Sequence, residues 1–141
     1  MANDAQKLSI QPGEWGPEAE RLLPLALQYA TLKEIRAQVE NGARLFYVTQ
    51  GAETVAAFVL RVDHTAEGSE GVIVAAAGKL KGGDLMATCM PAIESLFIGC
   101  KSIRYHTARP AVARKMAMLG YRPAEIVCTK ILEPKNASIA A

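Results

Sequence analysis

The sequence has few of the features that mark several large classes of protein. Its three cysteines, Cys89, Cys100 and Cys128, are far apart and form no Cys-x-x-Cys pair, which argues against a zinc or redox motif and favours reduced thiols. The formal net charge is only +2, without the concentrated basic face of a nucleic-acid-binding protein. A secretory signal and a bilayer-spanning apolar run are both missing. We therefore expect a cytoplasmic protein with no metal and no nucleic-acid or membrane partner.

The apolar residues that are present suffice for one core. Half of the 141 residues are hydrophobic, and a chain of this length usually forms a single domain. The two ends consist largely of polar or small residues, and chain ends of this kind are commonly poorly ordered. The sequence therefore predicts a loose N-terminus over residues 1–6, one domain over 7–134 and a loose tail over 135–141.

Hydrophobic periodicity predicts the order of the elements. Pro17 suits the first position of a helix, and Thr31 to Glu34 forms a capping box that would start a second helix. Short turns join three β-type runs into an antiparallel meander, over residues 45–49, 54–62 and 72–76. The other expected strands lie at 7–11, 103–107 and 125–132, and the later helices at 85–100 and 110–119. This order predicts an α/β fold with a mixed sheet between helices.

A glycine-rich turn, Lys79 to Asp84, connects the third strand of the meander to the next helix. Small residues at a helix start expose backbone amides, and the helix dipole adds positive potential. Such a nest can bind phosphate, and the pyrophosphate of coenzyme A (CoA) is a natural ligand. The alternative is an ordinary strand-to-helix turn in which Asp84 only caps the helix.

The turn and the segment Ser102 to Pro123 together resemble the GNAT superfamily of acetyl-CoA-dependent N-acetyltransferases. In that family an apolar strand precedes a Gln/Arg-x-x-Gly-x-Gly/Ala turn, and Lys79, Gly82 and Asp84 fall on its three defined positions. The later segment ends in Leu119-Gly120-Tyr121, which is similar to the family's entry into its final strand. The resemblance covers nearly the whole chain. It implies a GNAT-like mixed sheet of about six to seven strands, with a central antiparallel meander and about four flanking helices.

The resemblance also implies a function, that of an acetyl-CoA-dependent N-acyltransferase acting on a small-molecule or protein amine. Acetyl-CoA would be the cosubstrate, and a homodimer is left open. The residues that the resemblance assigns to cofactor binding are the strand end and the turn, namely Val72, Ile73, Val74, Lys79, Lys81, Gly82, Gly83 and Asp84.

The usual catalytic groups of the family are missing from their usual positions. Met116 stands where a tyrosine often protonates the leaving thiolate, and Arg109 stands where an asparagine is frequent. Other side chains could move protons instead, and the candidates are His64, Glu70, His106 and Tyr121. For each of them a structural role is the alternative.

Two further hypotheses compete with the enzyme. The missing groups, and a carboxylate at Asp84 where the family prefers glycine or alanine, suit a catalytically weakened GNAT-like structural or interaction module. A phage-encoded virion component would be an example. The same element order could also belong to an unrelated α/β fold, in which the turn would have no functional meaning.

Overall fold

The computed structural model describes residues 7–27 and 30–133, so the predicted loose ends at 1–6 and 135–141 lie outside the described residues. Five strands form one curved sheet in the order of the chain, β1-β2-β3-β4-β5. Their bounds are β1 Leu8–Pro12, β2 Arg44–Gln50, β3 Glu53–Thr65, β4 Gly68–Gly78 and β5 Ser102–Tyr105. The helices are α2 Pro17–Leu22, the 3₁₀ helix η1 Leu23–Ala26, α3 Leu32–Glu40, α4 Leu85–Ser95 and α5 Pro110–Met118.

The sheet is antiparallel from β1 to β4, and only its last pair is parallel. Short turns join β2, β3 and β4, which confirms the predicted meander. The connection from β4 to β5 contains α4, and a parallel pair requires such a crossover. The fold is thus α/β with a mixed sheet, as the sequence predicts.

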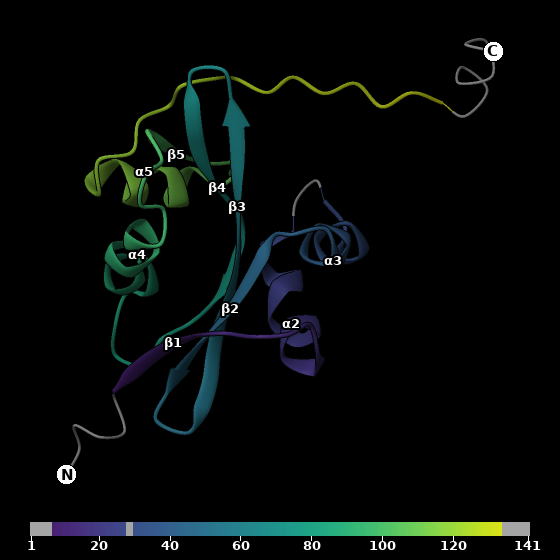
Figure 1. Cartoon of the computed structure of the whole chain (residues 1–141). Helices are drawn as coiled ribbons and strands as arrows, with labels where there is room; N and C mark the ends of the chain where they lie inside the picture. The colour runs from purple at the N-terminus through teal and green to yellow at the C-terminus, as the bar shows by residue number, and fades with distance from the viewer. Residues whose placement is uncertain (1–6, 28–29, 134–141) are drawn as a thin grey trace.

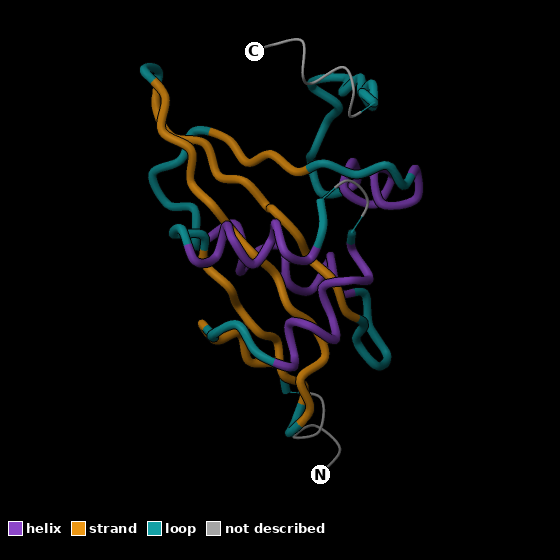
Figure 2. Tube along the Cα trace, turned by 90° about the vertical axis from the view of Figure 1, so that its right-hand side faces the viewer, coloured by secondary structure: helices purple, strands orange, loops and turns teal. Residues whose placement is uncertain are grey.

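The helices cover both faces of the sheet, with α2 and α3 on one side and α4 and α5 on the other (Figure 1). In the view turned by 90°, α2 and α3 lie in front of the strands (Figure 2). Each face has its own core. Ile93 of α4 and Met116 of α5 pack in one core with Phe58 of β3, whereas Leu22 of α2 and Ile35 of α3 belong to the other.

The helix starts follow the local sequence. Pro17 occupies the first turn of α2, and the Thr31 hydroxyl accepts a hydrogen bond from the Glu34 amide at 3.2 Å. Helix α4 begins at Leu85, as predicted, but ends at Ser95 instead of continuing to residue 100. Pro91 lies inside α4 and removes one backbone donor from it. Among the described residues, no helix combines the length and the apolar character needed to cross a bilayer.

The predicted final strand, residues 125–132, is wrong for this structure. Residues 121–133 belong to no helix or strand, and the described sheet has five strands, not six to seven. The segment is extended and runs away from the sheet (Figure 1). Alternating apolar residues favour an extended backbone, but a strand also needs a neighbouring strand to bond with. Within the described chain this segment has none.

Candidate functional site

A cavity opens where β4 and β5 separate. The two strands pair only as far as Ile73 and Tyr105, after which β4 continues to Gly78 with β3 as its one remaining neighbour among the described strands. Beyond that point lies a cavity of about 460 Å³. Its walls are the end of β4, the start of α4, the start of α5 and part of η1. Two neighbouring parallel strands thus separate at their carboxyl ends, and the cavity lies in the gap between them.

A β-bulge shapes the β4 wall of the cavity. Leu60 of β3 pairs with Ile73 and Val59 pairs with Ala75, so Val74 is the extra residue in the ladder. A bulged residue is left unpaired with the opposite strand. On the other side of β4, pairing with β5 ends at Ile73. In the described part of the chain, Val74 therefore brings a peptide group without a ladder partner to the cavity wall.

The glycine-rich turn is held against the end of β2. The Gln50 side chain accepts a hydrogen bond from the Lys81 amide and donates one to the Lys81 carbonyl, each at 3.2 Å. The Lys81 ammonium lies 3.3 Å from a Glu53 carboxylate oxygen. Gly82 follows with a φ of +71°, which favours glycine. These contacts turn Lys81 toward the β2–β3 hairpin, while Lys79 and Gly83 line the cavity.

Asp84 occupies the amides at the start of α4. Its Oδ1 accepts hydrogen bonds from the amides of Met86 at 3.0 Å and Ala87 at 3.4 Å. Its Oδ2 lies 3.4 Å from Nζ of Lys115 on α5. The Ala87 amide and then Lys115 hold the pKa of the Asp84 carboxyl below its ordinary value, so this group is a carboxylate at neutral pH. An N-cap of this kind was the alternative interpretation of the turn, and the cap is present.

The structure brings only part of the predicted cofactor set to the cavity. Ile73, Val74, Lys79, Gly83 and Asp84 line it, whereas Val72, Lys81 and Gly82 do not. Val72 is buried within the sheet. Val72 pairs with Arg104 of β5 before the two strands separate, so it lies outside the gap between them.

Of the four catalytic candidates, His106 is the one that lines this cavity, beside Tyr105 and Thr107. Glu70 lies in the paired part of β4, away from the separated ends. Its carboxylate oxygens lie 3.3 Å from Nη1 of Arg104 and 3.0 Å from the hydroxyl of Ser102, which donates to it. The surroundings of Glu70 are those of a structural ion pair.

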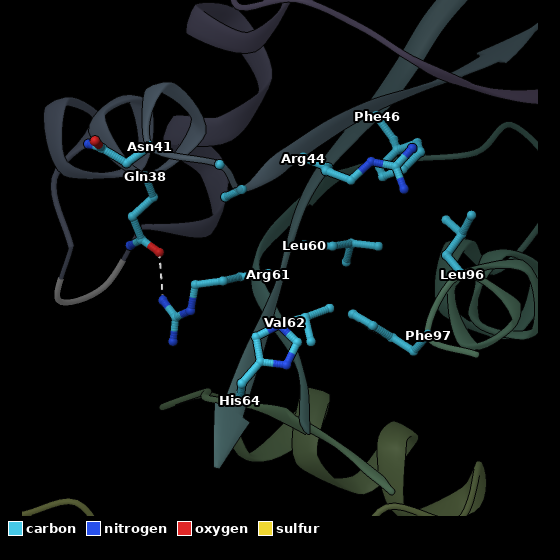
Figure 3. Close-up of a pocket in the computed structure, with 12 residues that line it drawn as sticks. Gln38, Asn41, Arg44, Phe46, Leu60, Arg61, Val62, His64, Leu96 and Phe97 are labelled. Carbon is cyan, nitrogen blue, oxygen red and sulfur yellow. Dashed lines mark hydrogen bonds between the residues drawn. The ribbon is translucent and has the colours of Figure 1, made fainter. Parts of the chain in front are cut away.

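His64 lines a second cavity, of about 530 Å³, on another part of the sheet (Figure 3). Its Nδ1 lies 2.9 Å from the Ser69 hydroxyl. Phe97, two residues after the end of α4, points into this space from one side (Figure 3). Arg61 donates a hydrogen bond to the Gln38 side chain at 2.6 Å on the other side. The two histidines of the chain are therefore in different cavities.

Tyr121 lies behind the wall of the first cavity. Its hydroxyl donates to Glu94 at 2.7 Å, and its ring contacts the Tyr105 ring edge-on at 5.9 Å between centroids. Burial, and then the hydrogen bond to Glu94, raise the pKa of the Tyr121 phenol well above its ordinary value. Tyr121 therefore supports Tyr105 by packing and holds its own proton firmly.

The contacts of two basic residues at the site, Lys115 and Arg109, were not predicted from the sequence, although Arg109 was noted there as a departure from the family pattern. Lys115 meets Asp84 only because α5 packs beside the start of α4. Arg109 donates from Nη2 to the Leu25 carbonyl at 3.0 Å, which joins the start of α5 to η1 across the cavity. No spacing along the chain signals either contact. The described residues contain no group of three or more His, Cys, Asp or Glu side chains that could hold a metal ion.

No protein-family model and no curated protein matches this sequence. Solved structures nevertheless share its fold. An integron cassette protein from V. cholerae is 7% identical with a TM-score of 0.66, covering 94% of this chain and 97% of its own. An aminoglycoside N-acetyltransferase in complex with CoA is 12% identical with a TM-score of 0.63, covering 89% and 95%. A GNAT family acetyltransferase from Staphylococcus aureus is 11% identical with a TM-score of 0.59, covering 90% and 100%.

Proposed function

We propose, for a chain that has the GNAT fold, that the cavity between β4 and β5 binds acetyl-CoA and that the protein transfers the acyl group to an amine. The amine belongs to a small molecule or to a protein. The proposal rests on one observation. Two parallel strands separate, and the gap between them ends at the start of an eleven-residue helix with lysines beside it.

The residues around the cavity fit a phosphate-bearing thioester. The first amides of α4, with Lys79 and Lys115 nearby, form a cationic end for a pyrophosphate. Asp84 at present accepts hydrogen bonds from two of those amides, so a pyrophosphate would have to displace its side chain. Further in, Ile73 and Met90 give the cavity an apolar wall for an acyl chain.

Acyl transfer from a thioester to an amine depends more on the positioning of the two substrates than on a covalent intermediate with the protein. A C–N bond forms as the C–S bond breaks, a proton leaves the amine, and the thiol leaves with a proton. The unpaired peptide group of Val74 is placed to polarise a carbonyl at the cavity wall. An imidazole can accept the amine proton at neutral pH, and His106 is the candidate that lines the cavity.

A catalytically weakened module is the second candidate, and two residues favour it. Asp84 places a negative charge on the amides that a pyrophosphate needs. Met116, at the family's tyrosine position, lines the cavity with a thioether, which has no proton to give to a leaving thiolate. A phage-encoded structural protein would fit this description. Turnover of acetyl-CoA with a panel of amines separates the two candidates, since only the enzyme releases free thiol.

Acetyl-CoA is expected to raise the melting temperature of the wild-type protein, and Ala76→Trp is expected to abolish this shift. A ligand at a hundred times its dissociation constant stabilises the fold by about 2.7 kcal/mol. Ala76 is an exposed residue of β4 that lines the cavity, so an indole there would fill the space. Ala66→Trp, at an exposed position in the β3–β4 turn, is the matched control and should keep the shift. Equal shifts in both variants would place the ligand elsewhere.

Lys79→Ala is expected to weaken acetyl-CoA binding about two- to fivefold, and Lys81→Ala is expected to leave it unchanged. Exposed charge pairs contribute about 0.2–1 kcal/mol, and since 1.4 kcal/mol corresponds to a tenfold change, the upper part of this range gives about two- to fivefold. Lys79 lines the cavity, whereas Lys81 pairs with Glu53 outside it. Titration calorimetry on both variants checks this. An equal loss of affinity in the two would show that bulk charge, and not position, matters.

A further inference from the structure

The second cavity, the one that His64 lines, lies where β3 runs past the start of β2. The first residue pair between these strands is Arg44 with Leu60, so residues 61–65 of β3 have β4 as their one neighbour among the described strands. The cavity of about 530 Å³ is at this open position beside β3 (Figure 3). We call it the β3 notch, and the residues that line it include Arg44, Phe46, Leu60, Val62, His64 and Phe97.

The backbone of β3 presents hydrogen-bonding groups to the β3 notch. Opposite residues of an antiparallel pair alternate between those that exchange N–H···O bonds with each other and those that do not. His64 lies opposite Ser69, whose carbonyl accepts the Lys101 amide at 2.8 Å on the β5 side. His64 and Ser69 therefore form a pair without such bonds, and by the same alternation so do Val62 and its partner. The N–H and C=O groups of Val62 and His64 thus face the β3 notch, where no described strand pairs with them.

One face of the β3 notch is apolar. Leu60, Val62 and His64 alternate along β3 and point to the same face, and Leu60 and Phe97 belong to one core. The Phe97 ring packs on Gly71, which lies opposite Val62, so closely that a Cβ on Gly71 would come 2.5 Å from it. Val62 itself is 41% exposed. The space beside Val62 and Phe97 therefore suits an apolar side chain of a ligand.

Arg44 lies at the end of the β3 notch where β2 begins. Its guanidinium is 4.9 Å from the centroid of the Phe46 ring. Within residues 7–27 and 30–133 it forms no ion pair with a carboxylate, whereas Arg61 in the same cavity lies 2.7 Å from an Asp63 oxygen. A guanidinium presents a planar fork of donors that matches a carboxylate. Arg44 is therefore the cation that a ligand carboxylate would meet.

Strand direction decides which end of a peptide meets Arg44. β2 is antiparallel to β3 and begins at Arg44. A peptide that prolongs the line of β2 in the same direction is also antiparallel to β3, and its last residue lies next to Arg44. Residues 61–65 of β3 extend over about 16 Å, which accommodates the last four or five residues of a chain. The terminal carboxylate then reaches the guanidinium while the peptide backbone bonds to β3.

We propose that the β3 notch binds the free C-terminal end of another protein as an added strand. Main-chain bonds hold this end to Val62 and His64, an apolar side chain packs beside Phe97, and the terminal carboxylate pairs with Arg44. In strand addition the main-chain bonds give affinity and the side-chain pockets give specificity. The β3 notch shares no lining residue with the cavity at the separated strand ends, so this inference stands independently of acyl transfer.

A synthetic array of heptapeptides with free C-termini, varied in their last three residues, tests the proposal on the full-length protein. Apolar last and third-last residues are expected to be selected, since residues opposite Val62 and His64 share their face. The tightest peptide is then measured by fluorescence anisotropy. Its C-terminal amide is expected to bind at least about ten times more weakly, because it brings no charge to Arg44. Selection of no peptide, or equal binding of acid and amide, would overturn the proposal.

Two variants locate the binding in the β3 notch. Arg44→Ala is expected to weaken the free acid about tenfold and to leave the amide unchanged. Val62→Pro is expected to weaken both, because proline removes the donor on the notch side and keeps the bonds between β3 and β4. Arg36→Ala is the control, since Arg36 is an exposed arginine of α3 that pairs with Glu40, and it should bind like the wild type.

Octanoate distinguishes strand addition from the binding of any apolar carboxylate. It carries the charge and an apolar chain but no peptide groups, so an equal concentration is expected to leave the peptide bound. Displacement of the peptide by octanoate would overturn strand addition. Equal losses of affinity in Arg36→Ala and Arg44→Ala would do the same, because they would show that bulk charge holds the peptide.

Discussion

Asp84→Gly is expected to bind acetyl-CoA about ten times more tightly than the wild type. Asp84 accepts hydrogen bonds from the Met86 and Ala87 amides and pairs with Lys115, so it competes with a pyrophosphate for the same donors and repels it. Charge-assisted hydrogen bonds are each worth about 1.5–3 kcal/mol, and 1.4 kcal/mol is a factor of ten in affinity. The fold should lose only a few tenths of a kcal/mol, since glycine is a tolerable cap.

Asp84→Asn is the control that separates charge from competition for the amides. Asparagine caps a helix as well as aspartate does, so it removes the repulsion but still occupies the donors. Its affinity is expected to lie between those of the wild type and Asp84→Gly. Calorimetric titrations at two salt concentrations measure all three, and the gain should be largest at low salt. If Asp84→Gly binds more weakly than the wild type, Asp84 shapes a productive loop and the competition hypothesis fails. If none of the three binds, the module is favoured over the enzyme.

Gly78→Ala is expected to destabilise the fold by more than about 3 kcal/mol, well above the usual cost of a single substitution. Gly78 ends β4 with a φ of +145°, a conformation that L side chains rarely adopt. A Cβ at this position would overlap the Cβ of Ala56 and the Val55 carbonyl oxygen on β3. That carbonyl also accepts the Lys79 amide at 3.1 Å, so relieving the overlap would break the link between β3 and the turn.

Gly42→Ala is the matched control for backbone strain alone. Gly42 has a φ of +112°, but a Cβ there would meet no atom within 4 Å. Its loss of stability should therefore stay at about 1–3 kcal/mol, the cost of an unfavourable backbone conformation. Urea denaturation of both variants measures the difference. Equal losses would mean that close packing between β3 and β4 contributes nothing at Gly78.

Local chemistry was sufficient to predict most of the fold. The proline in the first turn of α2, the hydroxyl cap of α3 and the carboxylate cap of α4 all lie where the sequence predicted them. The β-type runs between short turns gave the meander, and the helix in the connection between β4 and β5 makes that connection long enough for the parallel crossover that the structure contains. In each case the interacting groups are close together along the chain, or the chain length admits one geometry.

Several contacts in the site join residues that are far apart in the sequence, so they could not be predicted from it. Asp84 could be predicted as a cap from its neighbours, but its partner Lys115 could not, because only the packing of α5 beside α4 brings them together. The two histidines looked equivalent in the sequence. The structure places His106 at the separated strand ends and His64 in another cavity, because position along a strand and the face of the sheet are decided by register.

The sequence by itself determined the order of the elements, their caps and the apolar character of residues 126–132, because these depend on backbone preferences and on neighbouring side chains. Only the tertiary structure decided which of the predicted site residues share a cavity and whether the last apolar run becomes a strand. Ile126 and Ile131 favour an extended chain in any context, but a ladder forms only with a second strand within hydrogen-bonding reach. The edge of β5 is open, and the segment that could pair with it points away from its own sheet.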